Sequence, residues 1–182
     1  MNRGARNSAP ILSFKEVLLN KFDFYKIDEN YIKYLENFDN RVSKSYDNKS
    51  KRPFIGIVLK VEDFLYFAPF TSPKKKHLKM KNSVDFLKLD EGKLGAINFN
   101  NMIPVPRQQC IKIDVQNEKD IKYKMLLYKQ IKWCNKKENT KIILNKAAKL
   151  YEKVNRNKVP LNIINRCCNF KILEEKSKKY TN

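Results

Sequence analysis

The chain has 182 residues, of which 42% are hydrophobic and 12% aromatic, which is enough to build a packed core without disulfide bonds. The 39 Lys and Arg residues outnumber the 19 Asp and Glu residues, and the formal net charge is +20. This composition excludes a disordered basic tail, and no apolar run reaches the length of a transmembrane helix. Because a compact domain this positive repels itself, we expect a polyanionic partner, with nucleic acid favoured over an anionic membrane surface.

The cysteines and the start of the chain indicate a reduced, cytoplasmic protein. None of the four cysteines stands in a C-x-x-C pair, which predicts buried or half-buried free thiols. A single histidine cannot complete a zinc site of the usual spacing, so we expect neither a metal nor a cofactor. Residues 1–20 lack the apolar stretch of a signal peptide and form an N-terminal extension, and residues 21–182 form one domain.

The first predicted elements are a strand and a helix. Residues 21–27 alternate apolar and polar side chains, which predicts a half-buried strand. Asp28 then has the position of an N-cap for a helix over residues 29–38. The polar residues 39–53 that follow are predicted to form a loop of the length that often carries function.

A series of short strands comes next. Residues 54–61 are nearly continuously apolar and predict a central strand, and residues 64–70 predict its hairpin partner. A basic turn over residues 73–81 follows. Three further strands are predicted over residues 84–89, 95–99 and 102–105. Tight turns between short strands are typical of a small barrel or a strongly twisted sheet, here within residues 21–115.

The remainder, residues 116–182, is predicted to be helical and strongly basic. Apolar residues recur at helical spacing over residues 118–137 and 139–155. A short element follows over residues 163–168, and residues 170–173 fit either a strand or the start of a helix. Residues 119–182 hold 18 Lys and Arg against 5 Asp and Glu. The predicted fold class is therefore α+β, with the positive charge concentrated on its helical part.

Residues 71–77 combine groups that can act on a phosphodiester. Thr71 and Ser72 stand where a predicted strand ends, and Pro73 fixes the turn after them. The next residues are three lysines and His77. Hydroxyls on a rigid turn can hold a phosphate oxygen, and lysines can stabilise the charge that develops in a transition state. Because RNA supplies its own nucleophile, the ribose 2′-hydroxyl, such a site needs neither a metal nor a protein nucleophile.

The residues alone also allow a simpler interpretation. Thr71 and Ser72 can be ordinary turn residues, and the lysine run can be a solvated turn. His77 can be a surface histidine, and the apolar spacing around Tyr31 predicts a core position for that side chain. By these patterns alone, a non-catalytic basic RNA-binding regulator is favoured over a nuclease.

A chain-long resemblance changes that order. It is carried by Thr71-Ser72-Pro73-Lys74-Lys75, by Tyr66-Phe67-Ala68-Pro69 before it, and by the run from Ile97 to Val105. Further matching stretches are Phe24–Ile27, Tyr31–Leu35, Phe54–Leu59, Leu127–Gln130 and Cys167–Lys176. Over residues 22–180 the chain resembles the type III toxin–antitoxin endoribonucleases, the ToxN and AbiQ group of phage-defence toxins, and the AbiQ branch above all.

The resemblance implies a fold and an activity. The implied fold is similar to the Kid and MazF toxins, a small twisted antiparallel β-barrel or sheet elaborated with helices. The implied activity is metal-independent RNA cleavage by 2′-hydroxyl attack, which leaves a 2′,3′-cyclic phosphate and a 5′-hydroxyl. The implied partners are cellular or phage RNA substrates and an antitoxin RNA, a repeated pseudoknot that inhibits the toxin and is processed by it, within a possible higher-order assembly.

The resemblance also implies site residues, carried over by position. Thr71, Ser72 and Lys74 match the catalytic motif: the two hydroxyls would orient the scissile phosphate and Lys74 would stabilise the transition state. The residues expected to bind RNA are Tyr31, Lys51, Arg52, Lys75, Lys76 and His77, with His77 or Tyr31 also a candidate for proton transfer. Arg52 stands where a relative has lysine and cannot act as a base, because arginine stays protonated. Lys76 stands where relatives can carry an aromatic side chain, which removes one expected stacking contact.

Overall fold

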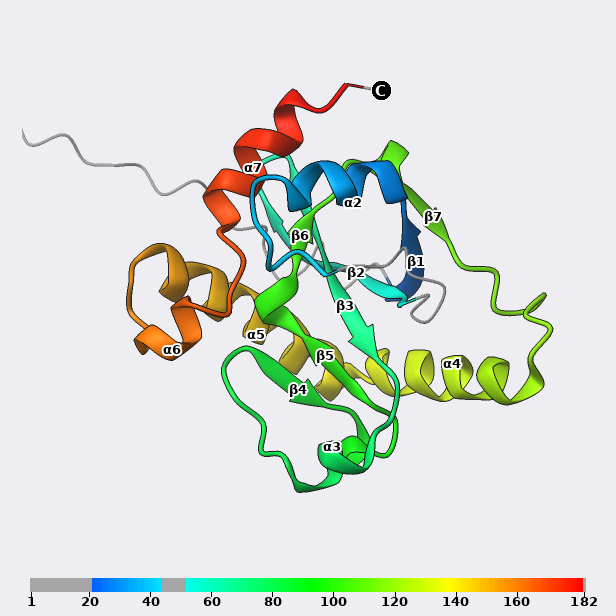
Figure 1. Ribbon diagram of the computed structural model, residues 1–182. Helices are drawn as coiled ribbons and strands as arrows, with labels where there is room; N and C mark the ends of the chain where they lie inside the picture. Colours follow the sequence, from blue (N-terminus) through cyan, green and yellow to red (C-terminus); the bar gives the residue numbers. More distant parts are fainter. Residues whose placement is uncertain (1–20, 44–51, 182) are drawn as a thin grey trace, which may run out of the picture.

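The computed structural model describes residues 21–43 and 52–181, and Figure 1 shows their arrangement. These residues contain one antiparallel sheet in the order β4-β5-β3-β2-β1-β7, with β6 pairing to β3 beside β5. The strands are β1 (Asp23–Ile27), β2 (Phe54–Val61), β3 (Phe64–Thr71), β4 (Phe86–Lys88), β5 (Ala96–Asn98), β6 (Ile103–Pro104) and β7 (Cys110–Lys112). The predicted strands are confirmed, and β7 is an additional strand.

The β2–β3 hairpin is the centre of the sheet. Its register pairs Phe54 with Pro69 and Val61 with Phe64. The other edge of β3 pairs first with β6, at Tyr66 and Phe67, and then with β5 at the end of the strand. β3 therefore has paired neighbours on both edges along its middle, and its last residue, Thr71, is held by pairing with β5.

Of the two predicted forms, a small barrel or a twisted sheet, the sheet is confirmed and the barrel is wrong. The sheet path has two different end strands, β4 and β7, and these do not pair with each other. Closing a barrel requires the two edges of a sheet to meet with consistent stagger. Both end strands have only three residues, and each makes its ladder with one neighbour, so the described sheet stays open.

Helices lie at the top of the view in Figure 1 and across its lower part, with the sheet between them. They are α2 (Glu29–Glu36), α3 (Lys75–Lys79), α4 (Ile121–Cys134), α5 (Lys137–Asn155), α6 (Leu161–Ile164) and α7 (Phe170–Lys179), with 3-10 turns η1 (Asp90–Gly92), η2 (Phe99–Asn101) and η3 (Arg107–Gln109). α5 packs on β2, while α7 packs on β6 and α2. No helix within the described ranges has both the length and the apolar character needed to cross a membrane.

Side-chain caps explain where several helices begin. The Asp28 carboxylate accepts a hydrogen bond from the Tyr31 backbone N–H, as the N-cap prediction required. Asp120 caps α4 in the same way. The amide oxygen of Asn169 accepts from the Ile172 N–H, so the segment that fitted either a strand or a helix forms a helix. The predicted basic turn is also partly helical, since it contains α3.

The core joins both halves of the chain and is rich in aromatic rings. Phe24 of β1 packs edge-on against Phe70 of β3, with ring centroids 4.9 Å apart. Phe170 and Tyr151 stack in the helical half. All four cysteines are free: Cys134, Cys167 and Cys168 are buried and Cys110 is half-buried, as predicted.

Candidate functional site

The candidate site begins at the end of β3. Thr71 pairs with Ala96 of β5 and is half-buried, and its hydroxyl donates to the Ala96 carbonyl oxygen at 3.2 Å. Ser72, the first residue beyond the strand, is exposed. The two adjacent hydroxyls therefore differ, because that of Thr71 is held by the sheet and that of Ser72 faces solvent.

Arg52 lies beside these hydroxyls on the neighbouring strand side. The Phe70 N–H donates to the Pro53 carbonyl oxygen at 2.9 Å, and this register continues to place Arg52 opposite Thr71. Arg52 is partly exposed, and its guanidinium donates to the Ser43 hydroxyl at 3.3 Å. The register thus places the backbone of Arg52, two residues before β2, opposite the last residue of β3. Lys51 falls outside the described residues.

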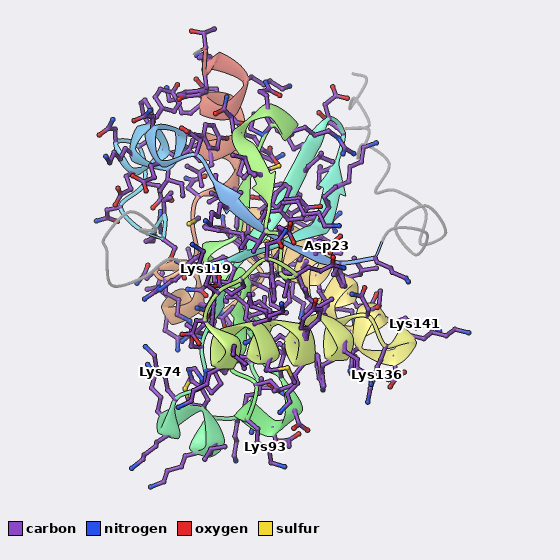
Figure 2. The ribbon with its side chains drawn as sticks, turned by 90° about the vertical axis from the view of Figure 1, so that its right-hand side faces the viewer. Asp23, Lys74, Lys93, Lys119, Lys136 and Lys141 are labelled. Atoms are coloured by element: carbon purple, nitrogen blue, oxygen red, sulfur yellow. The ribbon has the colours of Figure 1, made fainter. Side chains whose placement is uncertain are left out.

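The lysines of the motif surround α3. The Lys74 carbonyl oxygen accepts from the His77 N–H at 2.8 Å, which closes the turn that starts the helix. Lys74, Lys75 and Lys76 are exposed, and none forms an ion pair within the described residues. Their charges are available to an anion, and Figure 2 shows Lys74 at the lower edge of the face that α4 crosses.

His77 is buried, so its interpretation as a surface histidine is wrong. The side chain is 2% exposed and its ring lies 5.9 Å from that of Phe86. Within the described residues the buried Nδ1 atom has no hydrogen-bond partner. Burial lowers the pKa of His77, and the nearby charges of Lys76 and Lys74 lower it further, so the neutral ring is favoured. An almost fully covered ring has no surface to offer to RNA.

Tyr31 occupies a core position, as its spacing predicted. It is 0% exposed, its hydroxyl donates to the Pro104 carbonyl oxygen at 2.6 Å, and it shares a second hydrogen bond with the Ser177 hydroxyl at 2.8 Å. Pro104 pairs with Tyr66, five residues before Thr71 on β3, so Tyr31 lies roughly 16 Å from the strand end at the rise of a β-strand. Burial raises the pKa of Tyr31 well above its usual value. A contact of Tyr31 with RNA does not fit this position.

The described residues contain no group of three or more His, Cys, Asp or Glu side chains that could hold a metal ion. What the site does present is the exposed hydroxyl of Ser72, the ammonium groups of Lys74 to Lys76 and the guanidinium of Arg52. Such a set can orient and neutralise a phosphodiester, because hydroxyls donate to its oxygens and cations stabilise added negative charge.

The family is decided by comparison with known proteins. A family model described as "Toxin ToxN, type III toxin-antitoxin system" matches residues 23–178. The chain belongs to the ToxN toxin family. The expectation drawn from the sequence motifs is thereby confirmed.

Named members of the ToxN family cover most of the chain. The endoribonuclease ToxN of Pectobacterium atrosepticum is 38% identical over 165 residues, which are 86% of this chain and 92% of that protein. The endoribonuclease AbiQ of Lactococcus lactis subsp. lactis is 32% identical over 178 residues, which are 92% of this chain and 94% of AbiQ. The solved structure of AbiQ, described as a lactococcal anti-phage endoribonuclease of a type III toxin–antitoxin system, superposes with a TM-score of 0.74 at 29% identity, over 88% of this chain and 98% of that one.

A second solved structure of the family concerns inhibition. It is described as selective toxin inhibition by a non-coding RNA pseudoknot in type III toxin–antitoxin systems. It superposes on this chain with a TM-score of 0.75 and 32% identity, covering 88% of this chain and 98% of the other. The open sheet and its helices are therefore the architecture of the ToxN family.

Sequence reasoning missed residues that support the site from behind. Gly95 has φ +92°, and a Cβ built there would lie 2.0 Å from the Thr71 carbonyl oxygen. Gln130 of α4 donates to the Leu94 carbonyl oxygen at 2.7 Å. A glycine at the first position of a predicted strand was the available signal for the first contact, since close backbone approach favours glycine. The second joins segments far apart in the chain and leaves no local signal.

Proposed function

We propose that this chain is the toxin of a type III toxin–antitoxin system and cleaves RNA at the surface formed by Thr71, Ser72, Lys74 and Arg52. The observation that carries the proposal is an exposed hydroxyl beside unpaired cations at the end of β3, in a chain that belongs to the ToxN family. The relatives named endoribonucleases favour an enzyme over a non-catalytic RNA-binding regulator.

In the proposed reaction the ribose 2′-hydroxyl attacks the adjacent phosphorus atom. The 2′ proton leaves, the bond from phosphorus to the 5′ oxygen breaks, and that oxygen takes up a proton, so the products carry a 2′,3′-cyclic phosphate and a 5′-hydroxyl. No metal takes part. The protein contributes alignment of the attacking and leaving oxygens and stabilisation of the extra charge on phosphorus.

The site residues divide this work according to their surroundings. The Thr71 hydroxyl already donates to Ala96, so its role is to hold the strand end and to offer its lone pairs. The free Ser72 hydroxyl orients the phosphate, and Lys74 stabilises the transition state. Arg52, Lys75 and Lys76 bind flanking phosphates, as does Lys51. His77 supports α3 from beneath instead of touching RNA.

The proposal also covers the partners of the toxin and its place of action. A repeated, pseudoknotted antitoxin RNA binds the basic surface, is cut by the toxin and inhibits it, and RNA and protein together can form a higher-order assembly. Released toxin acts on cellular or phage RNA in the cytoplasm and aborts infection. The kinship with Kid and MazF belongs to the same proposal.

The test is cleavage of single-stranded RNA in EDTA, with both new ends mapped. We expect the intact chain to cut, and Ser72→Ala and Lys74→Ala each to lower the single-turnover rate by roughly 100- to 1,000-fold, as for the loss of one transition-state donor. Lys153→Ala, an exposed lysine of α5, is the matched control and should cut normally. RNA left intact by the parent chain would support a simple binding protein, and variants that cut at the parental rate would refute the site.

A further inference from the structure

One side of α4 exposes an apolar stripe to solvent. Ile121 is 75% exposed, Met125 51% and Tyr128 41%. Spacings of four and three residues place these side chains on one side of an α-helix. The opposite side, with Leu127, Gln130 and Cys134, is buried against the body of the protein. The helix is therefore anchored by one side and leaves large apolar groups, including an aromatic ring, uncovered on the other.

The same helix carries only positive charge. Its 14 residues include four lysines and no acidic residue. The lysines are Lys122, Lys124, Lys129 and Lys132. None of them forms an ion pair within the described residues, and Lys124 donates only to the Gln116 carbonyl oxygen. An apolar stripe flanked by unpaired cations matches a partner that offers flat apolar surfaces together with regularly spaced anions.

The buried side of α4 is connected to the back of the candidate active site through Leu94 and Gly95. Gln130 donates to the carbonyl oxygen of Leu94, and the adjacent Gly95 touches the Thr71 backbone. Tyr128 lies two residues from Gln130, about 200° around the helix, so it stands on the outer side of the same turn. In Figure 2 α4 crosses the front of the molecule, with Lys74 and Lys93 below it and Lys136 and Lys141 toward one end. Exposed lysines therefore lie on this side of the molecule both below α4 and toward one end of it.

We propose that α4 is a stacking platform for unpaired bases of the RNA strand that enters the site at Ser72. Only the link between this platform and Ser72 rests on the proposed function. Tyr128 stacks on one base, Met125 and Ile121 contact the bases beyond it, and the flanking lysines bind the phosphates between them. Aromatic stacking beside a cationic track is how proteins hold single-stranded nucleic acid.

The chemistry of the stripe favours a single strand over a duplex. A paired helix hides its base faces and would meet α4 through phosphates and sugars alone, leaving the apolar groups uncovered. An anionic lipid surface is the other partner for a basic helix with an apolar side. Membership of the ToxN family favours RNA over a lipid surface, because relatives in that family are named endoribonucleases.

The experiment measures binding of an unstructured RNA of about 20 nucleotides, longer than one such surface covers, to the full chain carrying Ser72→Ala. Adding Tyr128→Ala should raise Kd roughly five- to hundredfold, the range for removing one stacked base. Tyr128→Phe should restore parental binding, because the ring and not the hydroxyl carries the contact. Replacing Lys129 and Lys132 by Gln should reduce the dependence of log K on log salt by roughly 0.7 for each phosphate that the protein no longer binds.

Leu161→Ala on α6 is the matched control, since Leu161 is also an exposed apolar residue, at 69%, but lies away from α4 (Figure 1). It should not change Kd, and thermal melting should show that every variant is folded. Parental affinity in Tyr128→Ala, an equal loss for duplex RNA, or a loss for anionic lipid vesicles in place of RNA would each overturn the platform. Because this experiment measures binding and not cleavage, its failure can be distinguished from a failure of the cleavage test.

Discussion

At the residue scale, the position of Thr71 depends on the absence of a side chain at residue 95. Gly95 has φ +92°, which side chains disfavour, and the Thr71 carbonyl oxygen occupies the place of its Cβ atom. The neighbouring Ala96 then pairs with Thr71, and its carbonyl oxygen accepts a hydrogen bond from the Thr71 hydroxyl. One glycine thus lets β5 approach closely enough to hold the end of β3, which carries the exposed Ser72.

We predict that Gly95→Ala displaces this strand end. The new methyl would meet backbone and not a flexible side chain, and the backbone would be strained, so the free energy of unfolding should fall by about 2 kcal/mol or more. RNA cleavage should fall with it, even under conditions where the variant stays folded. Urea unfolding and single-turnover cleavage measure the two effects. Lys93→Ala, an exposed neighbour, should leave stability nearly unchanged; a Gly95→Ala variant as stable as this control would contradict the argument.

At the element scale, the segment that follows α3 is held by the helical half of the chain. Arg166, between α6 and α7, donates twice to the Asp85 carboxylate, at 2.6 Å and 2.7 Å. Asp85 is 2% exposed and also accepts from the Ser83 hydroxyl at 2.7 Å. Lys146 of α5 donates to the Ser83 carbonyl oxygen. The residues between α3 and β4 are therefore positioned by contacts with residues that stand 63 and 81 places later in the chain.

We predict that Arg166→Gln destabilises the fold in a pH-dependent way. Burial by itself raises the pKa of Asp85, but the hydrogen bonds from Arg166 and Ser83 outweigh it, and the net pKa is lowered. A lowered carboxyl pKa stabilises the fold above the unfolded pKa of about 4, and this stability is lost as pH falls through the folded value. The variant should therefore lose about 2 kcal/mol near neutral pH, where a buried carboxylate loses its partner, and the difference from the parent should shrink below about pH 4.

Urea unfolding between neutral and acidic pH measures this difference. Arg156→Gln is the matched control, because Arg156 pairs with Glu152 on the exposed surface of α5, where an ion pair contributes at most about 0.5 kcal/mol. A loss in Arg166→Gln that is no larger than in this control, or that does not change with pH, would show that the Asp85 contact is not what holds the segment.

At the scale of the whole molecule, a net charge of +20 acts in opposite directions on the free protein and on its RNA complex. The free fold is destabilised by its own repulsion. Bound RNA neutralises that charge and stabilises the fold by mass action. Lysines lie both at the proposed catalytic surface and on the proposed stacking helix, so the positive charge serves both.

We predict opposite salt effects on the two states. Between about 50 and about 200 mM NaCl the melting temperature of the free protein should rise, because repulsion is screened, while the increase in melting temperature given by single-stranded RNA should shrink. Thermal melting with and without RNA measures both trends. NaCl is used because sulfate would strengthen apolar burial by itself. A free protein that loses stability as NaCl rises would contradict the role given to self-repulsion.

Local residue patterns were enough to predict most strands and helices and to reveal the family motifs. Alternation predicted β1, the apolar run predicted β2, and Asp28 predicted the start of α2, because strand pattern and capping are set by residues a few places apart. The ordered series of motifs along the chain, with Thr71 and Ser72 among them, identified the family, later matched over residues 23–178. Apolar spacing also placed Tyr31 in the core, although the motif had suggested a site role for it.

Which groups the motif residues can reach depends on contacts between distant parts of the chain. β7 was missed because its three residues are held by β1, more than 80 residues away, and α3 was taken for a turn because nothing local shows how it is supported. The sheet stays open because each short end strand finds one neighbour, which no pattern within a strand reveals. His77 is buried while the adjacent lysines are exposed, and Arg52 lies beside Thr71, because contacts between distant segments and not chain neighbours set exposure and distance.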